Sequence, residues 1–188
     1  IDEAQGLAPE ELRLIRAVND ERLVFNLYGD ENQHIEGTKG VDRWSEFAGI
    51  LDVEPKLLNE NYRNARQITL ECNRRFGMEM LAINLDGNGV HTVSSQEEFV
   101  EKVTEAFTLT TRVGLKAIIV QNAKEARYIL EQFAMYKEKI HDMTGEEFSF
   151  HRTRWNLLTV AQSKGLEFGT VVAVSGHMSR NEKYIAYT

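Results

Sequence analysis

The chain has 188 residues, 42% of them hydrophobic and 27% charged, a balance that excludes a disordered chain. No apolar run approaches the roughly 20 residues needed to cross a bilayer, and the single cysteine, Cys72, excludes an internal disulfide framework. The formal net charge of -7 opposes nucleic acid overall, so contact with a phosphate backbone requires a local basic patch. We therefore expect a globular chain in a cytoplasmic setting, with no membrane partner.

The pattern in the first third of the chain predicts a helix between the end of one strand and the start of another. Ile1 has the pattern of the last residue of a strand that starts before it, which indicates a fragment of a longer protein. Pro9 and the glutamates after it predict a helix over residues 9–19, with a buried apolar stripe formed by Leu12, Leu14, Ile15 and Val18. A strand follows over residues 23–28, then a short helix over residues 44–51. Pro55 marks the expected boundary with the rest of the chain.

The remaining sequence alternates between strand and helix patterns. Strands are expected to end near residue 58 and to cover residues 90–93, 116–120, 157–160 and 170–174. Helices are expected over residues 65–76 and 96–109, and a third opens at the capping pair Asn122 and Glu125. Residues 81–89 look less regular, and residues 137–147 look like an exposed charged connection. This alternation predicts an α/β fold in which helices flank a parallel sheet.

Two predicted strands stop at an acidic residue that is followed three positions later by glutamine. Asp2 precedes Gln5 in this way, and Asp30 precedes Gln33. A hard divalent cation prefers carboxylate oxygen and an attacking water needs a base, so Asp2 with Glu3 suits Mg-dependent phosphoryl transfer. The alternative interpretation is structural, because acidic residues also favour helix N-termini.

A polar loop over residues 161–169 lies between two short apolar runs that resemble strands buried on both faces. It contains Ser163, Lys164, Gly165 and Glu167, and ligands of open α/β sheets bind where such strands end. The alternative is a surface connection whose glycines only make turns.

Two other stretches have the composition of a binding site. Tyr62 could stack on a base and Arg63 could clamp a phosphate, although a core tyrosine beside a surface arginine is the alternative. Residues 148–155 interleave aromatic and basic side chains, which suits a nucleic-acid backbone. We favour a half-exposed strand as the interpretation of that second stretch.

Five stretches stand in the order of motifs II to VI of the UvrD/Rep-like superfamily 1 helicases, and the chain resembles that family. They read IDEAQ, LYGDENQ, LNENYRN, LLTVAQSKGLEF and KYIAYT. The resemblance implies RecA-like domains of the P-loop NTPase type that bind ATP and Mg²⁺ between them. It implies a remnant of the first domain over residues 1–52 and most of the second over residues 53–188.

The resemblance also implies roles for individual residues. In the first domain, Asp2 would coordinate Mg²⁺, Glu3 would activate the attacking water, and Gln5 and Gln33 would sense the γ-phosphate. In the second domain, Tyr62 would stack on the adenine and Arg63 would contact the γ-phosphate. Glu167, next to Gly165, would contact the sugar of the nucleotide. Single-stranded DNA, or alternatively RNA, would face Thr159, Ser163 and Lys164.

The sequence departs from the family at several points. It contains no G-x-x-x-x-G-K-[ST] phosphate loop, so a missing N-terminal part of the same parent chain would have to supply one. Glu36 and Thr38 stand where relatives carry base-stacking aromatics, and Ala161 stands where they carry a histidine.

Three functions stay open at this point. The chain can be part of an ATP-dependent DNA helicase or translocase, with the isolated fragment inactive. It can be a motor-derived regulatory or interaction ATPase module that does not unwind. The third possibility is an α/β domain outside the motor proteins that binds a metal or another ligand.

Overall fold

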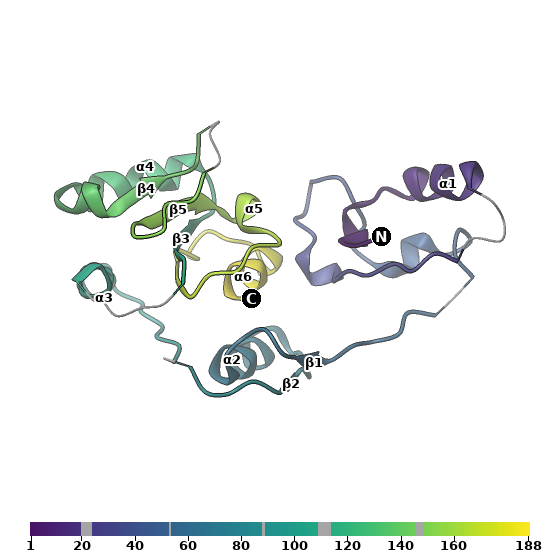
Figure 1. Cartoon of the computed structure of the whole chain (residues 1–188), viewed down its shortest axis with the longest axis horizontal. Coiled ribbons are helices and arrows are strands. Elements are labelled where there is room, and N and C mark those ends of the chain that lie inside the picture. Colours follow the sequence, from purple (N-terminus) through teal and green to yellow (C-terminus); the bar gives the residue numbers. More distant parts are fainter. Residues whose placement is uncertain (20–23, 53, 88, 109–113, 146–148) are drawn as a thin grey trace. The chain divides into compact units, whose positions relative to one another are not determined.

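The computed structural model of the protein describes residues 1–19, 24–52, 54–87, 89–108, 114–145 and 149–188. The chain forms two compact units, Ile1–Asn59 and Glu60–Thr188, and each is described separately below (Figure 1). The first unit thus continues past residue 52, where the sequence suggested a boundary. In the described ranges, no helix combines the length and apolar character needed to cross a membrane.

The first unit contains the helix α1 (Pro9–Val18) and the short 3-10 helices η1 (Ala4–Gly6), η2 (Glu31–Gln33) and η3 (Trp44–Phe47). Helix α1 begins at Pro9 as predicted, and a Glu11 carboxylate oxygen accepts the backbone N–H of Ala8 at 3.0 Å. The described residues 24–28 do not form the predicted strand, but this segment makes two hydrogen bonds of a ladder with Ile1: the Ile1 nitrogen donates to the Asn26 carbonyl at 2.7 Å, and the Tyr28 N–H donates to the Ile1 carbonyl at 2.9 Å. This alternation is that of parallel strands, and it places the ends of both segments side by side. Leu23 lies outside the described residues.

The predicted apolar stripe of α1 is only partly correct. Leu12 is fully buried with Val41, Phe47 and Ile50, but Leu14 and Val18 are 62% and 72% exposed. At 100° per residue, Leu14 lies about 200° around the helix from Leu12, so one packed face cannot bury both side chains.

The second unit contains a four-stranded sheet with the order β4-β5-β3-β6, and every neighbouring pair is parallel. Its strands are β3 (Lys116–Val120), β4 (Ile140–Asp142), β5 (Trp155–Thr159) and β6 (Thr170–Ala173). In the register of the inner strand β3, Lys116 pairs with both Trp155 of β5 and Thr170 of β6. The prediction of an α/β fold with a parallel sheet and flanking helices is therefore confirmed. A separate parallel pair joins β1 (Glu60–Asn61) to β2 (Leu81–Ala82).

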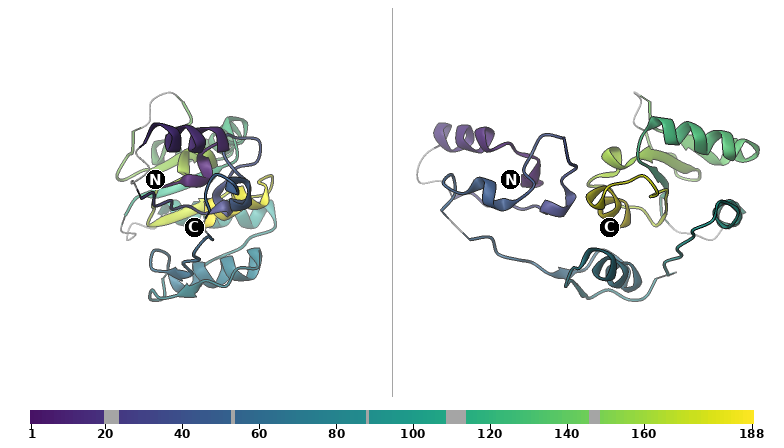
Figure 2. Two further views of the ribbon diagram at one scale, coloured as in Figure 1. Left: turned by 90° about the vertical axis from the view of Figure 1, so that its right-hand side faces the viewer. Right: turned by 180° about the vertical axis from the view of Figure 1, so that it is seen from behind.

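The helices of this unit are α2 (Arg66–Phe76), α3 (Gln96–Thr108), α4 (Ala123–Gln132), η4 (Ala134–Lys139), α5 (Val160–Ser163) and α6 (Arg180–Tyr187). Helices α3 and α4 contribute Phe107 and Ile129 to a core with Ile118 and Leu157 of the sheet. Helix α2 packs on α6 through Phe76 and Tyr184, whose rings meet edge to face at 5.5 Å. Figure 2 shows these helices from two further directions.

Four further local predictions are wrong. Leu57 and Leu58 do not end a strand but are 84% and 74% exposed, and β1 starts only at Glu60. Residues 90–93 form no strand. The supposed charged connection over 137–147 contains β4 and the fully buried Met143, because one edge strand of three residues needs few apolar positions. Residues 149–154 form no strand, and β5 begins at Trp155.

Candidate functional site

The Gln5 side chain connects the two acidic segments of the first unit, one at Glu3 and one at Asp30. It is fully buried, its amide nitrogen donates to a Glu3 carboxylate oxygen at 2.8 Å, and its amide oxygen accepts the backbone N–H of Asp30 at 3.2 Å. The Gln5 carbonyl also accepts the N–H of Val41 at 2.8 Å. One buried amide therefore fixes the carboxylate of Glu3 relative to the turn that starts at Asp30.

Two glycines allow this close packing around Gln5. A β-carbon at Gly29 would overlap the Gln5 amide oxygen, and one at Gly40 would overlap the Gln5 carbonyl. Gly40 also has a φ of 137°, which side-chain-bearing residues rarely adopt. His34 lies beside Gly40, buried, with its Nδ1 2.7 Å from an Asp42 carboxylate oxygen.

Glu3 has an unusual backbone conformation. Its φ of 53° and ψ of 38° are left-handed, and among the described residues it is the only non-glycine with positive φ. Such a conformation costs on the order of 1 kcal/mol and persists where the surroundings impose it, often at functional sites. Asp2, which precedes it, is exposed and accepts the Glu3 N–H at 2.9 Å. The strand end thus presents two adjacent carboxylates on a fixed turn.

The second glutamine, Gln33, is placed differently from Gln5. It ends η2, which Asp30 caps by accepting the Asn32 N–H at 2.9 Å, and it is half-buried. Its backbone N–H donates to Asp30 at 2.9 Å, but its side chain makes no hydrogen bond among the described residues. The two glutamines that the sequence treats alike therefore differ: Gln5 is a buried bridge and Gln33 is a partly accessible amide.

In the second unit, Arg63 and Glu167 form an ion pair. The Arg63 Nε lies 3.0 Å from a Glu167 carboxylate oxygen, and the two side chains are 53% and 69% exposed. Arg63 follows β1, and Glu167 lies in the loop between α5 and β6. The fold thus brings together two residues that the sequence assigned to nucleotide binding from distant stretches.

Asn61 shapes the loop that carries Tyr62 and Arg63. Its side-chain oxygen accepts the N–H groups of Arg63 and Asn64, at 3.2 and 2.9 Å. Tyr62 is 65% exposed, so the alternative of a core tyrosine is wrong, and its hydroxyl donates to Glu60. That hydrogen bond and the negative charge of Glu60 raise the pKa of the Tyr62 hydroxyl above its ordinary value.

The residues assigned to nucleic acid lie at the end of β5. Thr159 caps α5, its hydroxyl accepting the Gln162 N–H at 3.3 Å while the Gln162 side chain accepts the Thr159 N–H at 2.9 Å. Ser163 is buried, and its hydroxyl donates to the Val160 carbonyl at 2.8 Å. Lys164 is half-buried after the helix. Gly165 is exposed, and its φ of 76° is a turn conformation that favours glycine.

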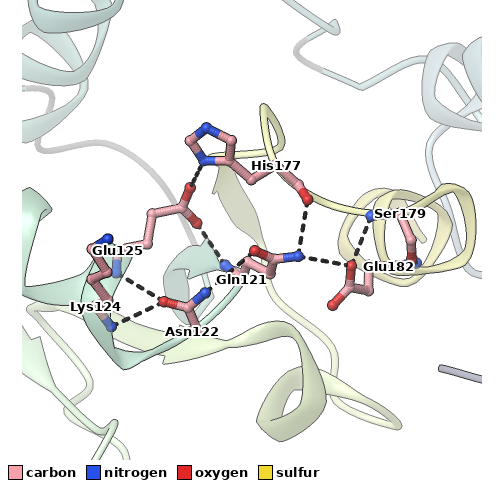
Figure 3. Close-up of polar contacts among 7 residues, drawn as sticks. All are labelled: Gln121, Asn122, Lys124, Glu125, His177, Ser179 and Glu182. Carbon is pink, nitrogen blue, oxygen red and sulfur yellow. Dashed lines mark hydrogen bonds and ion pairs between the residues drawn. The ribbon is translucent and has the colours of Figure 1, made fainter. Parts of the chain in front are cut away.

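A polar network at the carboxyl edge of β3 and β6 was not singled out from the sequence as a functional feature (Figure 3). The Gln121 side chain donates to the His177 carbonyl at 2.9 Å and to a Glu182 carboxylate oxygen at 3.3 Å. The Gln121 N–H donates to Glu125 at 2.7 Å, and the other Glu125 oxygen lies 3.0 Å from the His177 Nδ1. These contacts tie the start of α4 to the loop before α6.

The sequence predicted only one part of this network, the cap of α4. Asn122 caps α4 as expected, accepting the N–H groups of Lys124 and Glu125 at 3.0 and 3.1 Å. Ser179 caps α6, and its own N–H donates to Glu182 at 2.7 Å. The cross-links through Gln121 join residues far apart in the chain, so no local pattern reveals them.

The aromatic and basic stretch before β5 does not form one surface. Trp155 is 2% exposed and packs edge to face on Phe107, so its ring is not available to stack on a base. Phe150 is 37% exposed, and Phe148 lies outside the described residues.

The described residues contain no cluster of three or more histidine, cysteine, aspartate or glutamate side chains placed to hold a metal. Asp2 and Glu3 therefore offer a divalent cation at most two carboxylates. A scan against models of known protein families finds no match. A search of curated proteins also finds no match.

Proposed function

We propose that this chain is part of an ATP-dependent DNA helicase or translocase motor of the UvrD/Rep-like type. In this proposal both units are RecA-like, and the phosphate loop comes from a missing N-terminal part of the same parent chain. The observation that supports it most is the ion pair of Arg63 with Glu167, because it joins two stretches that resemble separate nucleotide-binding motifs.

The residues of the first unit suit Mg-ATP. Magnesium usually keeps several waters and takes one or two carboxylates together with substrate phosphates, so Asp2 suffices as its protein ligand. Bound ATP would supply the phosphoryl group, and the cation would neutralise charge on its phosphates. Glu3 would accept a proton from the attacking water, and Gln5 would orient its carboxylate through the bond of 2.8 Å.

The residues around the Arg63 ion pair of the second unit also suit a nucleotide. An exposed ion pair contributes at most about 1 kcal/mol, so a triphosphate can replace Glu167 as the partner of Arg63. The exposed ring of Tyr62 could then cover the adenine, and Glu167 could accept a hydrogen bond from the sugar. Single-stranded DNA would pass the end of β5, where Thr159, Ser163 and Lys164 lie.

Nucleotide binding by the full chain tests the proposal. Titration with a fluorescent methylanthraniloyl derivative of ATP in the presence of Mg²⁺ should show weak binding. Arg63→Ala should weaken it by about tenfold or more, because a charge-assisted hydrogen bond contributes about 1.5–3 kcal/mol. Arg152→Ala is the matched control, since Arg152 is an exposed arginine outside the site. Equal affinity of the two variants would reject the assignment of Arg63.

Catalysis gives a second test in a protein that joins this chain to a phosphate loop. Without that loop we expect no useful ATP hydrolysis. With it, Arg63→Ala should lower kcat by roughly 10³ to 10⁵, because an arginine finger acts on the charge that develops in the transition state.

A further inference from the structure

A basic hollow opens between α2 and α6, away from the residues discussed above. It has a volume of about 300 Å³ and is lined by Arg75, Phe76, Arg180, Lys183 and Tyr187. Arg63 precedes α2 whereas Arg75 and Phe76 end it, so the helix, about 16 Å long, separates the hollow from Arg63. The three cations of the lining contrast with a chain whose net charge is -7.

The two arginines of the hollow are held in place by aromatic rings. The Arg75 guanidinium lies over the Tyr187 ring, 5.4 Å from its centroid, and the Arg180 guanidinium lies over the Phe76 ring at 5.8 Å. Arg180 also donates to the Phe76 carbonyl at 2.7 Å. Because Phe76 and Tyr187 pack on each other, with centroids 5.9 Å apart, the positions of both guanidinium groups are coupled.

One nearby carboxylate neutralises only part of this charge. Glu71 pairs with Arg75 and also with Arg74, at 2.6 Å, while the second side of Arg75 donates to the Thr92 hydroxyl at 2.7 Å. The Lys183 ammonium has no hydrogen-bond or ion-pair partner among the residues that the structure describes. The hollow therefore keeps at least the positive charge of Lys183, which no described side chain neutralises.

We infer that this hollow binds a phosphate group. Guanidinium groups fixed on rings lose little freedom when they bind an oxyanion, and Lys183 adds a point charge beside them. One face of each ring already carries a guanidinium group, which favours recognition of a phosphate over stacking of a base. The volume is at the lower end of the range for small-ligand sites, which suits a single phosphate group of either a free or a polymeric ligand. The source of the phosphate is a nucleic-acid backbone or a free polyphosphate, and this inference does not rest on the proposed function.

Binding of two probes to the full chain tests the inference. The probes are a labelled single strand of twelve thymidines, followed by fluorescence anisotropy, and inorganic pyrophosphate, followed by calorimetry, both in low salt. Lys183→Gln should weaken binding by about threefold to tenfold. If the single strand is the ligand, the slope of log affinity against log salt should also fall by about 0.7, the contribution of one phosphate on a single strand.

Matched variants distinguish binding in the hollow from a general effect of removing one positive charge from the protein. Lys137→Gln removes an exposed lysine of η4, which adjoins β4 at the opposite edge of the sheet from β6, and should leave binding unchanged. Lys183→Arg should restore binding, and circular dichroism should show the same fold for all variants.

If Lys183→Gln weakens binding of the single strand and Lys137→Gln does not, the hollow is a site for a nucleic-acid backbone. If Lys183→Gln weakens binding of pyrophosphate alone, the hollow is a site for a free phosphate compound. Undiminished binding of both probes to Lys183→Gln would overturn the inference, as would the failure of both probes to bind the wild-type chain.

Discussion

Replacement of Gln5 by alanine should destabilise the first unit selectively. The variant removes a hydrogen bond to the charged Glu3 carboxylate, and it leaves the N–H of Asp30 without its acceptor. A hydrogen bond to a charged group contributes about 1.5–3 kcal/mol. Water that enters the vacated space offsets part of the penalty for the Asp30 N–H that has lost its acceptor. We therefore expect a loss of about 3 kcal/mol. At about 0.05–0.15 kcal/mol per residue, a unit of this size has a total stability of only about 3–9 kcal/mol.

Hydrogen exchange followed by mass spectrometry measures this effect unit by unit. In Gln5→Ala, amides within residues 1–50 that exchange through unfolding of the unit should exchange about 10² times faster. Peptides from β3 to β5 serve as an internal reference and should keep their wild-type rates.

Gln33→Ala is the matched control. It removes the same functional group from the second strand end, but the Gln33 side chain makes no hydrogen bond among the described residues, so exchange should hardly change. If Gln5→Ala and Gln33→Ala gave the same small effect, the buried bridge would not be what holds the two strand ends together.

Two further predictions concern helix α2, one on the pH dependence of stability and one on the reactivity of a thiol. Hydrogen bonds from Arg74 and Arg75 hold the pKa of Glu71 at about 2, below its ordinary value, so the native state favours the ionised carboxylate. Glu71→Gln should therefore lower the free energy of unfolding by up to about 1 kcal/mol at pH 7, and in urea titrations this difference should disappear as the pH falls from 4.5 toward 2. Cys72 is 1% exposed and burial raises its pKa to about 12, so a thiol reagent such as dithionitrobenzoate should label it only at the rate at which α2 detaches from α6. Rapid labelling of the native protein at pH 8 would contradict this packing.

Local sequence patterns predicted the sheet of the second unit well where they were strong. The run over residues 116–120 is continuously apolar after Lys116 and became β3 with the predicted bounds. Asn122 became the cap of α4 because a short side-chain acceptor at that position bonds the first free N–H groups of a helix. The three-residue strand β4 was missed because an edge strand is short and its flanks carry charge.

The candidate sites depend more on long-range contacts. The pairing of acidic residue and glutamine marked both Gln5 and Gln33, but only the structure shows that Gln5 is buried between Glu3 and Asp30. The basic hollow was not predicted, because Arg75 and Lys183 each look like ordinary polar positions on a helix. They form a site only when α2 packs on α6, and that packing is set by Phe76 and Tyr184.

The all-parallel sheet also constrains how the chain can be made. The central strand β3 acquires its first partner residue at Trp155 and completes its other side only at Thr170, opposite Lys116. A ribosome that adds about 5–20 residues per second needs about 2–8 s to pass from position 116 to position 155. During that interval the apolar residues Ile118 and Val120 have no strand beside them, although α4 can already form and cover one face. Helices α3 and α4, which pack on β3 in the folded unit, can therefore cover this strand during synthesis before either neighbouring strand exists.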